Sequence, residues 1–175
     1  VLPIAAIIML FAIPYCATQS FIVRYTETRS LAVTVSLFFP IYAAALLILR
    51  LTMRNLFDRL RFPVFFTGSS ICAFLAILLL ALMRSNLPMC AAAVLMAGSY
   101  GIMSSVCQSR VMAGREHAGL GNSTYYIGLD LGMTLGPMLG GILYGSVNVR
   151  LFYPFLLLCV PAAVLVFLLN RRTLA

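Results

Sequence analysis

The chain has 175 residues and a net charge of +8, with 63% hydrophobic and only 9% charged residues. A soluble domain carries about 25% charged residues, and a mean hydropathy of +1.06 is too high for a surface in contact with water. These values exclude a soluble enzyme, a disordered segment and a secreted disulfide-rich domain, and they leave an integral membrane protein.

Six apolar stretches follow one another along the chain, each close to the ~20 residues that a helix needs to cross a bilayer. The expected helices cover residues 2–23, 32–53, 63–83, 88–113, 123–144 and 151–169. The connectors are too short to hold a soluble domain, and the alternating pattern of a transmembrane β-strand is absent from the sequence. We therefore predict an all-α membrane protein, with residues 1–175 forming one six-helix transmembrane bundle.

All twelve basic residues are arginines that stand in ones and twos between apolar stretches, unlike the clustered basic face that binds nucleic acid. We expect a lipid bilayer as partner and no nucleic acid. When the connectors alternate between the two sides, eight arginines fall on one side and four on the other. The eight are Arg50, Arg54, Arg59, Arg61, Arg110, Arg115, Arg171 and Arg172. The positive-inside rule then predicts that both termini are cytoplasmic.

The beginning of the chain indicates a piece of a longer protein. Val1 already stands inside an apolar stretch, and that stretch lacks the basic start of a signal peptide. The five cysteines lie inside or at the ends of apolar stretches without CxxC spacing, which favours small core residues over metal ligands. We expect no metal, no cofactor and no catalytic constellation, and therefore no enzyme.

Several spans place polar and aromatic residues near mid-membrane on one helix face. Tyr15 and Gln19 are four residues apart on the first span, as are Tyr126 and Asp130 on the fifth. The predicted cavity residues are Tyr15, Gln19, Tyr42, Tyr100, Ser104, Gln108 and Tyr126. These side chains either form ordinary hydrogen bonds between helices or line a substrate cavity. The third and sixth spans lack such faces, so we expect them to face lipid or to support the others.

Asp130 lies about eight residues inside the cytoplasmic edge of the fifth span, or about 12 Å deep at ~1.5 Å per residue. A carboxylate at that depth is costly unless it faces a cavity or a charged partner. Two roles stay open: Asp130 carries a proton, or it forms a structural ion pair with Arg110 or Arg50. Upstream of it, residues 122–124 are expected to cap the start of the helix.

Glycines recur every four residues along the fifth span, which places them on one smooth helix face. The stripe comprises Gly128, Gly132, Gly136 and Gly140, with Gly141 beside it. Pro137 removes a backbone hydrogen bond and permits a bend. The pattern indicates either static close packing or a hinge at which helices slide or rock.

The connector between the second and third spans is short and rich in arginine. In it Asp58 stands among Arg54, Arg59 and Arg61. The simpler interpretation is that the arginines of this connector only mark the cytoplasmic side of the membrane, as the positive-inside rule describes. In the alternative interpretation the connector is a gating loop, in which Asp58 accepts hydrogen bonds from helix N-terminal amides and pairs with arginine to latch the cytoplasmic face.

These segments resemble the carboxy-terminal half of a major facilitator superfamily transporter of the drug or sugar efflux type. Asp58-Arg59 stands where the family has its cytoplasmic loop G-x-x-x-D-R-x-G-R, although the glycines of that loop are missing here. Residues 132–141 resemble the antiporter motif G-x-x-x-G-P-x-x-G-G, which is best known from the fifth helix of the amino-terminal half. Residues 121–132 are similar to the eleventh helix of efflux members, and residues 20–50 resemble helices seven and eight.

The resemblance covers essentially the whole chain. It implies half of a twelve-helix fold, built from two inverted three-helix repeats, with the amino-terminal half as a missing partner. It also implies alternating access, in which spans one, two, four and five face the cavity or the other half. We predict an inner-membrane antiporter that exports a small, partly apolar compound, with protons as the coupling ion. The alternatives are a membrane scaffold or assembly protein that transports nothing, and a proton-driven importer.

Overall fold

Within the residues that the computed structural model describes, 1–57, 59–113 and 118–174, six helical segments are long and apolar enough to cross a membrane. They run over Leu2–Thr28, Val35–Met53, Phe62–Ala81, Asn86–Met112, Ala118–Ser146 and Val149–Leu169. The predicted all-helical fold of six spans is confirmed. Helices suit this composition because the bilayer core offers no hydrogen-bond partners to an unpaired backbone.

Four of the spans contain a single long helix, whereas the fourth and sixth are interrupted. The uninterrupted helices are α1 (Leu2–Thr28), α2 (Phe38–Phe57, after the 3-10 turn η1, Val35–Leu37), α3 (Phe62–Ala81) and α6 (Ala118–Ser146). The fourth span consists of α4 (Asn86–Met96), the π-helical turn η2 (Ala97–Gly101) and α5 (Ile102–Met112). The sixth consists of η3 (Val149–Leu151), α7 (Phe152–Leu156) and α8 (Cys159–Leu169), and α9 (Arg171–Leu174) follows it.

Helix α6 begins earlier than the sequence predicted. Because it starts at Ala118, residues 122–124 lie inside the helix, and the expectation that they cap its start was wrong. The hydroxyl of Ser123 donates to the carbonyl of Gly119 at 3.0 Å, and that of Thr124 to the carbonyl of Leu120 at 2.9 Å. Such bonds to the preceding turn let polar side chains sit within a helix.

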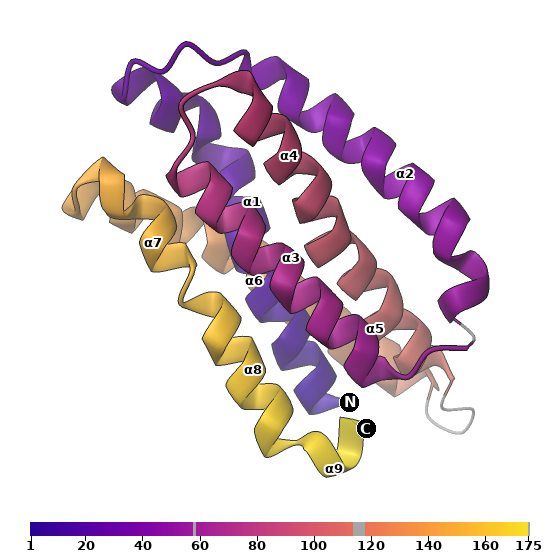
Figure 1. Cartoon of the computed structure of the whole chain (residues 1–175). Coiled ribbons are helices and arrows are strands. Elements are labelled where there is room, and N and C mark those ends of the chain that lie inside the picture. The colour runs from indigo at the N-terminus through magenta and orange to yellow at the C-terminus, as the bar shows by residue number, and fades with distance from the viewer. Residues whose placement is uncertain (58, 114–117, 175) are drawn as a thin grey trace.

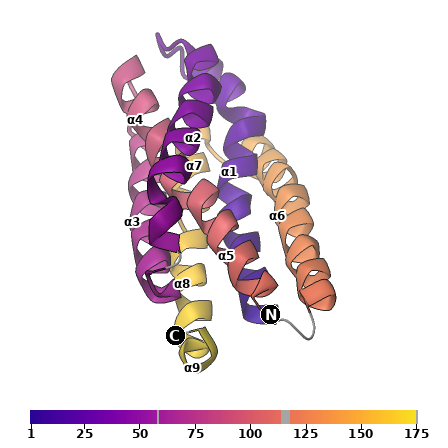
Figure 2. The same ribbon diagram turned by 90° about the vertical axis from the view of Figure 1, so that its right-hand side faces the viewer.

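The helices form one bundle in which α1 is central (Figures 1 and 2). Helix α1 packs along α6 and also contacts α8, α5 and η2, while α3 packs against α4, and α2 against α4 and η2. In the most apolar window of each span, 56% of the residues of α1 are buried, against 22% in α6 and 11% in α2. Helices α2 and α6 therefore present the largest free faces. Both termini lie at the same end of the bundle.

The glycine stripe of α6 seats this helix directly on α1. Gly128, Gly132, Gly136 and Gly140 are all buried. A Cβ at Gly132 would lie 2.7 Å from the carbonyl oxygen of Met9, and one at Gly136 would lie 2.8 Å from the Cβ of Cys16. The backbones of α1 and α6 can approach this closely only because the glycines have no side chain. The structure thus shows close packing within the bundle, and the predicted hinge movement stays a prediction.

Candidate functional site

Three tyrosines from three different elements form one aromatic stack. The ring centroid of Tyr15 on α1 lies 5.0 Å from that of Tyr42 on α2 and 4.5 Å from that of Tyr100 in η2. The interplanar angles are 29° and 15°, so Tyr15 is the middle ring of the stack. Tyr42 is buried, whereas Tyr15 and Tyr100 are partly exposed. Offset stacks of this kind contribute about 0.5–1.5 kcal/mol per pair beyond the area that they bury.

The π-helical turn η2 positions Tyr100 for the stack, and it was not predicted from the sequence. A π turn locally widens a helix, and such turns occur often at functional sites. The hydroxyl of Ser69 on α3 donates to the carbonyl of Gly98 at 3.2 Å, which satisfies a backbone group that the irregular turn exposes. At the end of the turn, Gly101 lies against Leu46 of α2 with no room for a Cβ. The two glycines that bracket Tyr100 are the sequence signal that could have indicated the turn.

A second group of the predicted residues meets between α5 and α6. The side-chain amide of Gln108 donates to the hydroxyl of Tyr126 at 3.1 Å. The neighbouring Tyr125 is buried, and its hydroxyl donates to the backbone carbonyl of Ser104 at 3.1 Å. Gln108 is partly exposed and Tyr126 is 42% exposed, so this pair lies at the surface of the six-helix bundle.

Arg50 lies on α2 and is exposed. Its positive charge has only a weak, long-range effect on Tyr42, Tyr100 and Tyr125. From the sequence Arg50 was counted as an edge charge or as a partner of Asp130. Among the described residues, no ion pair joins Arg50 to Asp130.

Asp130 and Gln19 lie on the exposed surface of the six-helix bundle. Asp130 is two residues from both Gly128 and Gly132, and at about 100° per residue it falls on the opposite face of α6 from the glycine stripe. Packing of the stripe on α1 therefore leaves the carboxylate uncovered. The structure does not bring Asp130 to Arg110, which is also exposed, and among the described residues no ion pair joins them. The role of Asp130 stays a prediction.

The predicted gating loop is described only in part. Arg59 and Arg61 are exposed, and Arg61 directly precedes the first residue of α3. Asp58 and the side chain of Arg54 lie outside the described residues. The latch between Asp58 and an arginine therefore stays a prediction.

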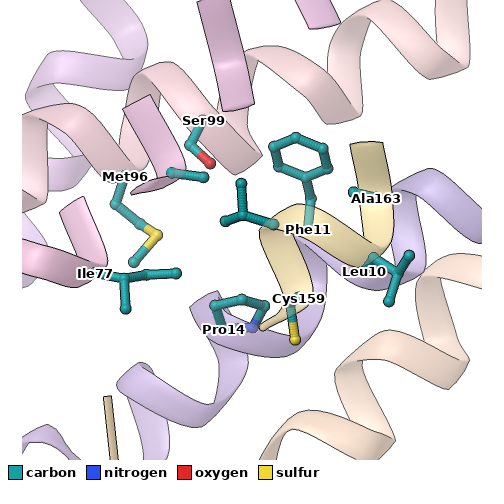
Figure 3. A pocket seen from close by; sticks show the side chains of 10 residues that line it. Leu10, Phe11, Pro14, Ile77, Met96, Ser99, Cys159 and Ala163 are labelled. Atoms are coloured by element: carbon teal, nitrogen blue, oxygen red, sulfur yellow. The ribbon is translucent and has the colours of Figure 1, made fainter. Parts of the chain in front are cut away.

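An internal pocket lies between α1, α3, η2 and α8 (Figure 3). Three irregular points of the bundle border it: Pro14 inside α1, Ser99 in η2, and Cys159 at the start of α8 just after the interruption of the sixth span. Its remaining lining is apolar and comprises Leu10, Phe11, Ala73, Ile77, Met96, Val160 and Ala163. None of the predicted cavity residues lines this pocket, so we assign it to packing.

Metal-binding groups do not gather in the part of the chain that the structure describes. Within it, no three His, Cys, Asp or Glu side chains lie close enough together to hold a metal ion. The five cysteines are free thiols, and Cys16 and Cys107 are buried among apolar neighbours. The described residues offer a ligand other groups: the rings of the tyrosine stack, the amide of Gln108 and hydroxyl of Tyr126, the guanidinium of Arg50 and the carboxylate of Asp130.

Comparison with known proteins identifies one family. The family model of the Major Facilitator Superfamily matches residues 4–174. That range includes all six spans, so the match rests on the whole bundle rather than on one motif. No curated protein and no solved structure matches the chain significantly.

Proposed function

Because the chain belongs to the Major Facilitator Superfamily, a superfamily of membrane transporters, we propose that it is the carboxy-terminal half of a secondary active transporter that exports a small, partly apolar compound in exchange for protons. The observation that carries this proposal is the aromatic stack, in which Tyr15, Tyr42 and Tyr100 come together from three elements. Alternating access about a shared central site, as between two such halves, is the mode of transport that we propose.

The distribution of polar residues supports this proposal. The stack, the Gln108–Tyr126 pair and Asp130 belong to spans one, two, four and five. The third and sixth spans contribute none of these side chains. Helices α2 and α6 also have the largest free faces in the described chain, which leaves them surface for contact with a second half.

Proton coupling is proposed from the position of Asp130. It lies well inside α6, in a span apolar enough to cross the membrane, and it is exposed on the half-bundle. An ionisable residue inside a span tends to mark an ion or substrate pathway. We propose that Asp130 faces the space shared with the second half, where it takes up and releases the exchanged proton.

We further propose an inner-membrane location with both termini in the cytoplasm. The termini lie at the same end of the bundle (Figure 1). The connectors at that end carry the larger share of the arginines in the sequence, and the positive-inside rule assigns such an end to the cytoplasm.

A membrane scaffold is the main alternative, and one observation argues against it. If the polar side chains served only to hold helices together, they would be buried in bonds between helices. Instead Gln19 and Asp130 are exposed, and Tyr126 is 42% exposed. A proton-driven importer would share the same residues and would differ only in the direction of transport.

Transport by the full-length protein in proteoliposomes tests the proposal. A proton gradient is imposed across the vesicle membrane, and movement of a panel of labelled drugs and sugars is followed in both directions. We expect at least one compound to move against its concentration gradient, in the direction opposite to proton flow. Movement in the same direction as the protons would show the importer, and no gradient-dependent movement of any compound would support the scaffold.

Replacing the middle ring of the stack is expected to weaken substrate binding. Tyr15→Leu removes the ring that holds Tyr42 and Tyr100 in place, and we expect the Kd for a transported compound to rise by about tenfold because the site loses its preorganisation. Tyr15→Phe keeps both contacts and should change the Kd less than about threefold. Equilibrium binding to purified full-length protein measures the effect. Tyr144→Leu, which removes a ring that stacks on Phe21 instead, is the matched control. An equal loss in Tyr15→Leu and Tyr144→Leu would contradict the assignment.

A further inference from the structure

We propose that the outer face of the sixth span binds an anionic phospholipid, with an acyl chain in a groove along α7 and α8 and the phosphate against Arg171 and Arg172. Helices α7, α8 and α9 follow one another along one edge of the bundle (Figure 1). The inference is independent of transport, because this face is built from other elements than the tyrosine stack.

The groove lies where the sixth span is interrupted. Pro161 has no amide hydrogen to donate to the carbonyl of Leu157, four residues earlier. That carbonyl accepts from the amide of Val160 instead, at 3.1 Å. Between α7 and α8 the surface is hollowed into a groove of about 510 Å³, which Phe74 of α3 borders on the other side. The side chains that line the groove are those of Leu, Val, Pro and Phe.

The length of the groove suits a lipid chain. Its lining begins at Pro154 and ends at Leu168, fourteen residues further on, which corresponds to about 21 Å at ~1.5 Å per residue. One leaflet of the hydrocarbon core is about 15 Å deep, half of the ~30 Å of the bilayer core. An acyl chain can therefore lie in the groove over the depth of its leaflet.

Two arginines stand at the end of this groove. Leu168 lines both the groove and a second pocket of about 640 Å³, whose lining includes Arg171 and Arg172. Both arginines are exposed, and within the described part of the chain neither forms an ion pair. Guanidinium groups bind phosphate oxygens through charged hydrogen bonds, and arginines at the membrane surface attract anionic lipids. The two adjoining pockets thus match the two parts of an anionic phospholipid.

The fold holds both arginines beside the end of α8. The side-chain amide of Asn170 donates to the carbonyl of Val166 at 3.0 Å, which satisfies a backbone group in the last turn of α8. After the arginines, Leu174 is 2% exposed and packs in the apolar core. Arg171 and Arg172 lie between these two fixed points, in α9. The pocket for the phosphate is therefore part of the folded bundle.

A second copy of the chain suits the groove less well than a lipid. Helices that pack on each other in a membrane use small residues for close approach, whereas this groove is lined by Leu, Val, Pro and Phe. In a two-fold dimer within a membrane, both copies have the same orientation. A contact along α8 would bring Arg171 and Arg172 of the two copies together, and these like charges would repel.

Retention of lipid by the full-length protein tests the inference. Protein in a neutral detergent is mixed with anionic dioleoylphosphatidylglycerol or zwitterionic dioleoylphosphatidylcholine, and the bound lipids are counted by native mass spectrometry. Because the acyl chains are the same, we expect several-fold more phosphatidylglycerol to be retained. Arg171→Gln combined with Arg172→Gln should remove this preference. Arg59→Gln combined with Arg61→Gln, at two exposed arginines of the same end of the bundle, is the matched control and should keep it.

A second pair of variants tests the groove. Leu165 lines the groove and is 58% exposed, so Leu165→Trp should fill the groove without disturbing the core. We expect this variant to retain several-fold less phosphatidylglycerol than the wild type. Ile71→Trp is the matched control, at a residue of α3 that is 55% exposed, and it should retain as much phosphatidylglycerol as the wild type.

The inference is overturned if both lipids are retained equally, if the two pairs of arginine substitutions have equal effects, or if Leu165→Trp and Ile71→Trp behave alike. Displacement of phosphatidylglycerol by an excess of glycerol 3-phosphate would also overturn it, because the arginines would then bind a phosphate that has no acyl chain. A dimer that Leu165→Trp dissociates would assign the groove to a second copy, which likewise contradicts the lipid.

Discussion

Gly132→Ala is expected to lower the melting temperature of the full-length transporter by several degrees. The added Cβ would lie 2.7 Å from the carbonyl oxygen of Met9 and 2.7 Å from the Cβ of Ala12. One of these neighbours is backbone, so relief requires that α6 moves away from α1. Overpacking of this kind costs about 1–3 kcal/mol. Thermal unfolding of the detergent-solubilised protein, followed by circular dichroism, measures the change.

Gly141→Ala is the matched control in the same helix. Gly141 is exposed, and a Cβ there would have the ring of Phe21 at 3.7 Å, which is ordinary van der Waals distance. Alanine also has a higher helix propensity than glycine. The melting temperature of this variant should therefore stay the same or rise slightly. Equal melting temperatures for Gly132→Ala and Gly141→Ala would show that the stripe is not what seats α6 on α1.

Asp130→Asn is expected to abolish proton-driven transport, with the rate in vesicles falling to that of vesicles without protein. Asparagine keeps the size and polarity of the side chain but cannot carry a proton. Because Asp130 is exposed and forms no described ion pair, expression and thermal stability should change little. Exchange of labelled for unlabelled substrate at equal pH on both sides should persist, because it needs no net proton movement.

Glu27→Gln provides the comparison for this experiment. Glu27 is also exposed, but it lies at the very end of α1, one residue before Thr28, rather than deep in a span, so its neutralisation should leave proton-driven transport intact. Normal pH-dependent transport by Asp130→Asn would remove this residue from the coupling step. Loss of both transport and exchange would indicate that Asp130 binds substrate instead.

The fold could be predicted from the sequence because its main signals are local. Hydropathy over windows of span length located the six helices, and the four-residue glycine spacing indicated a face for close packing that the structure shows on α1. The ends of the helices could not be located as well, because α1 and α6 continue past the apolar residues. In α6, Ser123 and Thr124 satisfy their hydroxyls within the helix, which hides its true start.

The role of the candidate site residues stays a prediction, and their arrangement could not be predicted. Counting along the spans picked out the three tyrosines that the structure stacks, yet it could not show that Tyr15 stands between two other rings. That arrangement depends on the packing of three elements and on the π turn that carries Tyr100. Contacts between spans are set by tertiary packing, and one sequence contains no direct record of them.

The close packing of α6 on α1 leaves no room for one helix to slide past the other without a clash. Tyr15 is next to Cys16, the residue that contacts Gly136, and Asp130 is two residues from Gly132 on the same α6. We therefore expect Tyr15 and Asp130 to keep a constant distance from each other in any rigid-body movement of the bundle.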